Sequence, residues 1–124
     1  MANPNIVNVA TIYGNNSTTA LSTTSATAIV NNAAGSGKVY KINSIVVANV
    51  DGASAADITI EVYSQDDLGG TAYAIASTIA VPADASLIVM DKSTSIYLLE
   101  DQSIGATAGT ANDLVVTATW EEIS

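Results

Sequence analysis

Three residue types that often carry protein chemistry are missing from the sequence, which contains no Cys, no His and no Arg. Without Cys the chain can form no disulfide, thiolate nucleophile or sulfur-ligated metal site. Without His it lacks the usual general base near neutral pH and the commonest metal ligand. We therefore expect no catalytic, cofactor-binding or metal-binding residues, and a protein that is not an enzyme.

Charge is also scarce. Only 12% of the 124 residues are charged, whereas a soluble domain devotes about a quarter of its residues to charge. Twelve acidic residues against three Lys give a net charge of −9. Because phosphate binding uses clustered Lys and Arg, nucleic acid is not an expected partner. The 48% hydrophobic content and a mean hydropathy of +0.35 indicate a largely uncharged surface.

Long hydrophobic runs are absent as well. The longest aliphatic runs, 45–48 and 87–90, are far shorter than the roughly 20 residues that span a bilayer, so no membrane segment is expected. The first nine residues have neither the basic region nor the apolar block of a signal peptide. We expect a soluble chain and, from its length, a single domain over residues 1–124 with one core.

Apolar residues alternate with polar ones at the spacing of β-strands. Ile58, Ile60 and Val62 alternate with Thr59 and Glu61, which is typical of a half-buried strand. The same reasoning predicts about eight or nine strands, near residues 5–13, 20–31, 38–50, 57–64, 72–81, 86–91, 96–100, 103–108 and 113–122. The predicted fold is an all-β, single-domain antiparallel β-sandwich that is jelly-roll-like.

Turn residues separate these segments, at 13–17, 35–37, 51–52, 66–70, 81–84 and 108–113. Pro82 has no N–H to donate and should end a strand. The Ala-rich stretch after Asp51-Gly52 indicates a loop longer than a two-residue hairpin. Ala is also frequent in 72–80, but the period of two there excludes a helix.

A short glycine motif and a hydroxyl-rich segment are weak candidates for sites. Gly35-Ser-Gly-Lys38 resembles the end of a phosphate loop, but Asn32 and Val39 occupy motif positions and a strand follows, so a Gly-rich turn with a solvated Lys38 is expected. Asn15-Asn16-Ser17-Thr18 holds two overlapping glycosylation sequons, which matter only in a secretory pathway. Ser and Thr are abundant, but no Ser-x-x-Lys pattern supplies a base.

Three pairs of neighbouring acidic residues are candidates for metal binding or acid catalysis. Asp66-Asp67 could donate oxygen atoms to Ca²⁺, but two residues are too few, and a solvated loop tip is expected. Glu100-Asp101 and Glu121-Glu122 resemble paired catalytic acids. Neighbours on a strand point to opposite faces, so we expect them to be edge charges that discourage strand pairing.

The aromatic side chains offer either a stacking platform or packing. Trp120 and the five Tyr could bind a sugar or a base, but Trp120 alternates with Leu114, Val116 and Ala118. We therefore expect Trp120 to pack in the core.

Several segments together resemble a known family. Residues 37–52, 55–62, 81–87 and 91–98, with Met1-Ala-Asn-Pro-Asn-Ile6 and Glu121-Glu-Ile-Ser124, look like the small virion structural proteins of marine tailed phages, cyanophages especially. The resemblance covers nearly the whole chain and rests on strand and turn patterns. Relatives tend to carry Glu-Gly-Asp before the Ser-Ile strand, where this chain has Glu100-Asp-Gln-Ser-Ile104.

The resemblance implies a component of the virion. Together with large, weakly polar sheet faces, which favour burial between subunits, it leads us to expect a capsid decoration or cement protein. Its expected partners are the major capsid protein and further copies of itself, as a homo-oligomer and in particular a trimer. Alternatives are a neck, tail or head-fibre component that binds a host surface or glycan through loops such as 64–71, a bacterial surface or pilus-like module, and a carboxylate-dependent hydrolase.

The segment up to Tyr13 leaves two possibilities open. Rich in Asn and uncharged, with alternating aliphatic residues, it could form a strand of its own sandwich or an arm exchanged with a neighbouring subunit.

Overall fold

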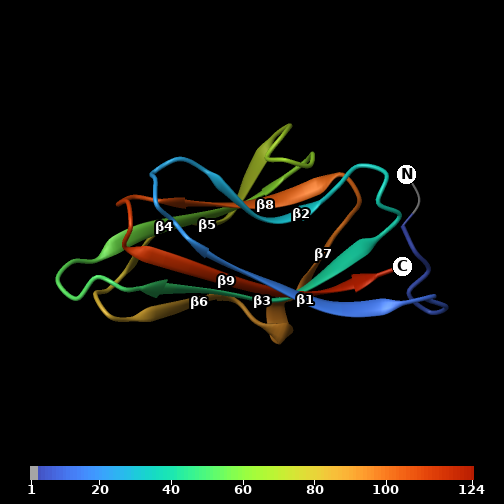
Figure 1. Cartoon of the computed structure of the whole chain (residues 1–124), viewed down its shortest axis with the longest axis horizontal. Helices are drawn as coiled ribbons and strands as arrows, with labels where there is room; N and C mark the ends of the chain where they lie inside the picture. The colour runs from blue at the N-terminus through green and yellow to red at the C-terminus, as the bar shows by residue number, and fades with distance from the viewer. Residues whose placement is uncertain (1–2) are drawn as a thin grey trace.

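The computed structural model describes residues 3–124, which fold into nine β-strands and one turn of 3₁₀-helix (Figure 1). The strands are β1 (Ile12–Ala20), β2 (Thr27–Asn32), β3 (Val39–Asn49), β4 (Ala56–Tyr63), β5 (Ala72–Val81), β6 (Ser86–Met90), β7 (Ile96–Leu98), β8 (Gln102–Ala108) and β9 (Leu114–Ile123), and the 3₁₀ turn is η1 (Lys92–Thr94). The strand pairings are all antiparallel. The predicted all-β sandwich is confirmed.

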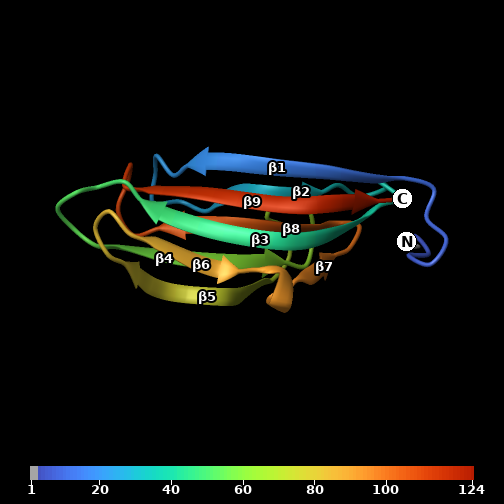
Figure 2. The ribbon, with the colours of Figure 1, turned by 90° about the horizontal axis from the view of Figure 1, so that it is seen from below.

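The strands lie in two sheets with an order that identifies the topology. One sheet, which we call sheet A, has the order β1-β9-β3-β6, with β7 also paired to β3, and the other, sheet B, has the order β2-β8-β4-β5. In Figure 2 the strands of sheet A lie side by side in front of those of sheet B. Two packed sheets whose first and last strands interleave in this way, with β6 and β7 following one another along β3, form a jelly roll. The first described residues and the C-terminus lie at the same end of the sandwich (Figure 1).

The chain passes from one sheet to the other at most of its connections. β3 belongs to sheet A and β4 to sheet B, so the segment around Asp51-Gly52 is a crossover between layers, longer than a hairpin as predicted. Pro82 directly follows β5, where its missing N–H costs no ladder bond.

The core lies between the sheets. It is filled by every second residue along each strand, because these residues face inward. Its largest fully buried side chains are Leu21, Ile42, Ile45, Ile58, Ile60, Leu98, Ile104, Leu114, Val30, Val47, Val81 and Val116. Burial of each such side chain contributes about 1.5–3 kcal/mol. Trp120 is also buried and stacks on Tyr40 with ring centroids 6.0 Å apart, so its predicted packing role is confirmed.

Two buried asparagines hold the crossovers that follow β2 and β3. Asn32 donates from Nδ2 to the carbonyl oxygens of Lys38 and Leu98, and Asn49 donates to those of Ser54 and Val81. Buried backbone carbonyls need such partners where no strand supplies them. These side chains therefore fix where the chain leaves one sheet for the other.

The prediction for the N-terminal third was wrong in three places. Residues 3–11 contain no strand, and a turn closes where Asn8 N donates to Asn5 O. The expected turn at 13–17 is instead the middle of β1, and the expected strand 20–31 is shortened to β2. The cause is the long-range ladder with β9, which supplies hydrogen bonds to a segment whose Gly and Asn residues otherwise favour turns. Met1 and Ala2, the start of the expected arm, lie outside the described residues.

Candidate assembly surface

The outer face of sheet A is a surface of small, mostly uncharged side chains. The strand register aligns its residues in four rows across the sheet: Ala20, Val115, Ala48 and Ser86; Thr18, Thr117, Val46 and Ile88; Asn16, Thr119 and Ser44; and Gly14, Glu121, Lys41 and Tyr97. Charge is confined to Glu121 and Lys41 in the last row. We call this set the sheet A face.

Burial shows that these residues face away from the core. On β9 and β3 they alternate with side chains that are completely buried, such as Val116, Ala118 and Val47. Ile88, by contrast, is 64% exposed in the second row. A large exposed apolar side chain near the β6 edge of a sheet face is the kind of feature that marks an interaction site.

The outer face of sheet B has a different character because it carries acidic residues. Asp57 and Glu61 lie on β4 and alternate there with buried Ile58 and Ile60. The 64–70 loop adds Asp66 and Asp67. The two faces of the sandwich therefore differ in charge, a division that composition alone does not locate.

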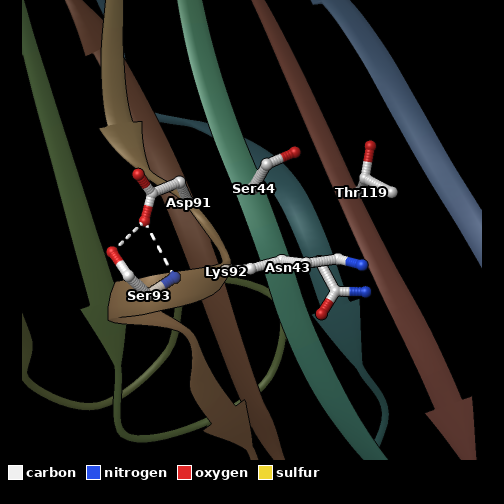
Figure 3. A pocket seen from close by; sticks show the side chains of 6 residues that line it. All are labelled: Asn43, Ser44, Asp91, Lys92, Ser93 and Thr119. Carbon is white, nitrogen blue, oxygen red and sulfur yellow. Dashed lines mark hydrogen bonds between the residues drawn. The ribbon is translucent and has the colours of Figure 1, made fainter.

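A hollow of about 630 Å³ interrupts the sheet A face beside η1. It is lined by Asn43, Ser44, Asp91, Lys92, Ser93 and Thr119. Figure 3 shows the Lys92 side chain extending from η1 across β3 toward β9. The hollow is the polar part of a face that is otherwise formed by small side chains.

Asn43 lies at a register shift of β3, so it is an additional residue in the strand. Its Nδ2 donates to Glu121 Oε1 at 3.1 Å, but nothing within residues 3–124 donates to its Oδ1, although that atom is buried. An unpaired buried acceptor is rare in folded proteins and costs stability.

Asp91 caps η1 at the rim of the hollow. Its Oδ1 accepts from Ser93 N and Ser93 Oγ, and Thr94 completes a capping box. The Ser93 hydrogen bonds, from its side chain and then its backbone, lower the pKa of the Asp91 carboxyl, with a further contribution from Thr94. Asp91 is therefore a fixed negative group at the edge of the hollow.

Glu122 has a structural role, and the predicted edge position of Glu121-Glu122 was wrong. Both residues lie on β9, which is flanked by β1 and β3, so neither is on a sheet edge. Glu122 accepts hydrogen bonds from Asn15 Nδ2 and Trp120 Nε1 and forms an ion pair with Lys38 at 3.2 Å. Burial opposes the charged form of Glu122, but these donors outweigh it, so its pKa is lowered. Lys38, expected to be only solvated, is a partner of Glu122.

The 64–70 loop is held against sheet B. Asp66 accepts from Ala34 N, Asp67 accepts from Asn31 Nδ2, and Leu68 N donates to Ser103 Oγ. Leu68 lies so close to Gly105 that a Cβ there would come within 2.8 Å of Leu68 Cδ2. The expected solvated loop tip is thus a docked loop.

Glu100 and Asp101 also depart from the prediction, because they lie in the turn between β7 and β8. Glu100 is buried and accepts from Gly37 N, and Asp101 accepts from Asp66 N. Both carboxylates tie loops together. No group of three or more acidic residues within residues 3–124 is placed to hold a metal ion.

The glycine motif and the glycosylation sequons, the other candidate sites in the sequence, lie in a turn and in a strand. Gly35 and Gly37 have φ of +78° and +67°, which only Gly adopts readily, and they form the predicted turn into β3. The sequon residues 15–18 lie within β1. In the described part of the chain, no helix is long and apolar enough to cross a bilayer.

A small cavity of about 190 Å³ lies at the end of the sandwich where the termini meet. It is lined by Asn3, Pro4, Ile6, Val39, Tyr97 and Leu99. The preceding segment is attached to its own chain where Ala10 N and Thr11 N both donate to Ser124 O. Residues 3–11 therefore lie as a non-strand segment against their own sandwich.

Comparison with known proteins places the chain by fold alone. No protein-family model matches it, and no curated protein sequence is significantly similar. Its structure is similar to that of a protein of Bacillus endospore appendages, which form a family of disulfide-linked pili, with a TM-score of 0.52 and 18% identity over 92% of this chain and 88% of the other. A pentameric capsid protein from metagenomic phage sequences matches with a TM-score of 0.39 and 17% identity over 96% of this chain and 64% of the other. The first of these likenesses supports the β-sandwich fold.

Proposed function

We propose that the chain is a non-enzymatic structural protein of a phage virion, a capsid decoration or cement protein that binds the head shell through the sheet A face. The observation that carries the proposal is the position of the charge. A chain of net charge −9 leaves one sheet face without net charge, while the charged residues of the opposite face, Asp57 and Glu61, are acidic. On the sheet A face Lys41 lies opposite Glu121, and Lys92 and Asp91 lie together at the hollow.

Two further features of the face support a docking role. Ile88 projects from its second row, and exposed apolar side chains of this size anchor protein interfaces. The hollow lined by Ser44, Lys92 and Thr119 offers polar groups to a partner. The jelly roll is itself a fold used by viral capsid domains.

The work of such a protein is mechanical. Molecules that bind only the assembled shell stabilise it by mass action. Contact across junctions between capsid subunits would oppose opening of the shell under internal pressure. The acidic face of sheet B would then point to solvent. The partner on the sheet A side would be the major capsid protein, with the decoration protein as a homo-oligomer.

The test is binding to heads of the phage that encodes this chain, prepared without it. Ile88→Lys should weaken binding at least about tenfold, or ~1.4 kcal/mol, because it places an unpaired charge in the contact. The matched control is Ala80→Lys, which adds the same charge to the outer face of sheet B, opposite Asp57, and should bind as the wild type does. Equal binding of wild type and Ile88→Lys would refute the proposed face.

Location in the particle tests the role itself. Density for the chain on the head shell in cryo-electron micrographs is expected. Density at the neck or tail only, together with specific binding to a glycan array, would instead support the host-binding alternative.

A further inference from the structure

The edges of the two sheets lack the charges that usually protect edge strands. The edge strands are β1 and β6 in sheet A and β2 and β5 in sheet B, and β7 continues β6 along β3. None of these five strands contains a charged residue or a Pro, although Lys and Pro commonly prevent edge pairing. The charged residues within strands lie on interior strands instead: Lys41, Asp57, Glu61, Glu121 and Glu122.

Irregularities protect three of the four edges. The register of β2 shifts at Ile29, whose carbonyl already accepts from Ser17 Oγ at 2.6 Å. β6 is five residues long and its register with β3 also shifts. β5 has two shifts against β4, and Thr78 within it has a φ of +49°. Bulges of this kind disrupt the flat ladder that a second strand would need.

β1 is different because it is regular along its whole length. Its nine residues pair with β9 without any shift. Thr11 N, just before the strand, donates to Ser124 O, and Leu21 N, just after it, donates to Leu114 O. Because the direction of backbone groups alternates in an antiparallel strand, the even-numbered residues from Ile12 to Ala20 direct their N–H and C=O groups to the free edge. Asn16 N, as this requires, donates to the Asn15 side chain rather than to β9.

We propose that β1 pairs antiparallel with β1 of a second copy of the chain, across a two-fold axis near Asn16. Asn16 is the middle residue of β1, so full overlap of two such strands centres there. The pairing would join two sheets A into one continuous sheet with the order β6-β3-β9-β1-β1-β9-β3-β6. The sheet A face would double in width, which deepens the proposed function and rests on it.

Charge favours a second copy as the occupant. Each copy carries −9, so two copies repel one another except where charge is absent. Residues 1–37 contain no charged side chain at all, and this region includes β1. A two-fold axis supplies an antiparallel partner of equal length automatically. The resulting dimer differs from the trimer expected from the resemblance, so molecular size distinguishes them.

The first experiment removes one free-edge donor. Thr18→Pro deletes an N–H that faces away from β9, so the monomer should still fold, as Pro is tolerated on edge strands. Light scattering coupled to size-exclusion chromatography should give twice the 12.5 kDa chain mass for the wild type and for the control Thr18→Val, and 12.5 kDa for Thr18→Pro. A monomeric or trimeric wild type, or a folded Thr18→Pro that stays dimeric, would overturn the proposal.

A charge pair at the axis provides a second test that keeps the backbone intact. Asn16→Lys alone and Asn16→Glu alone should each shift the protein to monomer, because like charges would lie directly opposite one another. An equimolar mixture should restore dimers that contain one chain of each kind. Failure of the mixture to dimerise would exclude pairing centred on Asn16.

The two proposals fail separately. If β1 pairing is wrong, Thr18→Pro has the mass of the wild type. If the proposed function is wrong, the chain dimerises through β1 but Ile88→Lys and the wild type behave alike toward phage heads.

Discussion

Glu122 shows how one side chain can link three parts of the sandwich. It accepts hydrogen bonds from Asn15 on β1 and from Trp120 on its own strand, and it pairs with Lys38 at the start of β3. Tyr40 lies in the same group, and burial, together with the charge of Glu122, raises the pKa of its hydroxyl. The end of the core next to the chain termini is therefore organised around a single carboxylate.

Acidification should weaken this arrangement. The pKa of Glu122 in the folded protein lies below its ordinary value of 4.5, so its stabilising effect is present above about that pH and is lost as the pH falls through the folded-state pKa. Glu122→Gln should lose less thermal stability than the wild type between pH 7 and pH 3.

At pH 7 the same variant should be less stable than the wild type by at most about 1 kcal/mol, because its contribution there is that of a partly exposed ion pair. Thermal melts monitored by circular dichroism measure both effects. Parallel loss of stability in the two proteins on acidification would show that Glu122 does not carry the pH dependence.

At the scale of elements, the buried asparagines explain how short connections switch sheets. Asn49 ends β3 and donates to the carbonyls of Ser54 and Val81, which belong to the crossover loop and to β5. Its Oδ1 also accepts from Asp51 N at 2.9 Å. One side chain thus satisfies three backbone groups at the point where the chain leaves sheet A.

Removal of this side chain should be costly. Asn49→Ala leaves the buried carbonyl of Val81 without its side-chain donor and also removes the bond to Ser54 O. We expect a loss of about 1–3 kcal/mol in the free energy of unfolding, measured by urea titration. Asn8→Ala, at an exposed position outside the strands, is the control and should unfold at the wild-type urea concentration. An equally small effect of both substitutions would mean that water replaces the Asn49 side chain.

The sequence predicted elements better than it predicted their connections. β3 and β4 show clear alternation, so their positions were correct to within a residue or two, and the β5 region was recognised despite its Ala content. β1 was misplaced because Gly14, Asn15 and Asn16 favour a turn locally, whereas the strand is imposed by β9 from the far end of the chain.

The sequence predicted that a weakly charged surface exists, but not which residues form it. Low charge predicted a large uncharged face, yet which residues share that face depends on the register of four strands, and pairs such as Val46 and Ile88 are set by long-range hydrogen bonds. The interior position of Glu121 and Glu122 was missed for the same reason. The unpaired Asn43 Oδ1 left no signal in the sequence, because it depends on a bulge.

For the whole molecule, the division of charge between the two faces makes association depend on pH. At pH 7 the net charge of −9 opposes association beyond the pair joined through β1, and this repulsion decreases toward the pI near 4.1. Uncharged faces and edges then meet with less opposition.

Light scattering should therefore report growing assemblies as the pH is lowered from 5 toward 4, the range in which carboxylates take up protons. Added salt at pH 7 should produce a smaller increase, since it screens the same repulsion. Ile88→Lys should reduce this increase. Scattering that stays constant from pH 5 to pH 4 would contradict control of association by net charge.

The pairing of β1 with β9 also has a consequence for how the chain reaches its native state. Asn15 and its hydrogen-bond partner Glu122 are separated by 107 residues. β2 likewise pairs with a strand far along the chain, β8. Topologies dominated by such distant contacts fold slowly, because a large loop must close before any contact compensates for the lost entropy. During that interval two uncharged strands remain open to pairing with other chains. The absence of charge that would suit β1 to pairing between copies also leaves it unprotected during folding. Misassembly with other chains is therefore the greatest risk in the period before β9 pairs with β1.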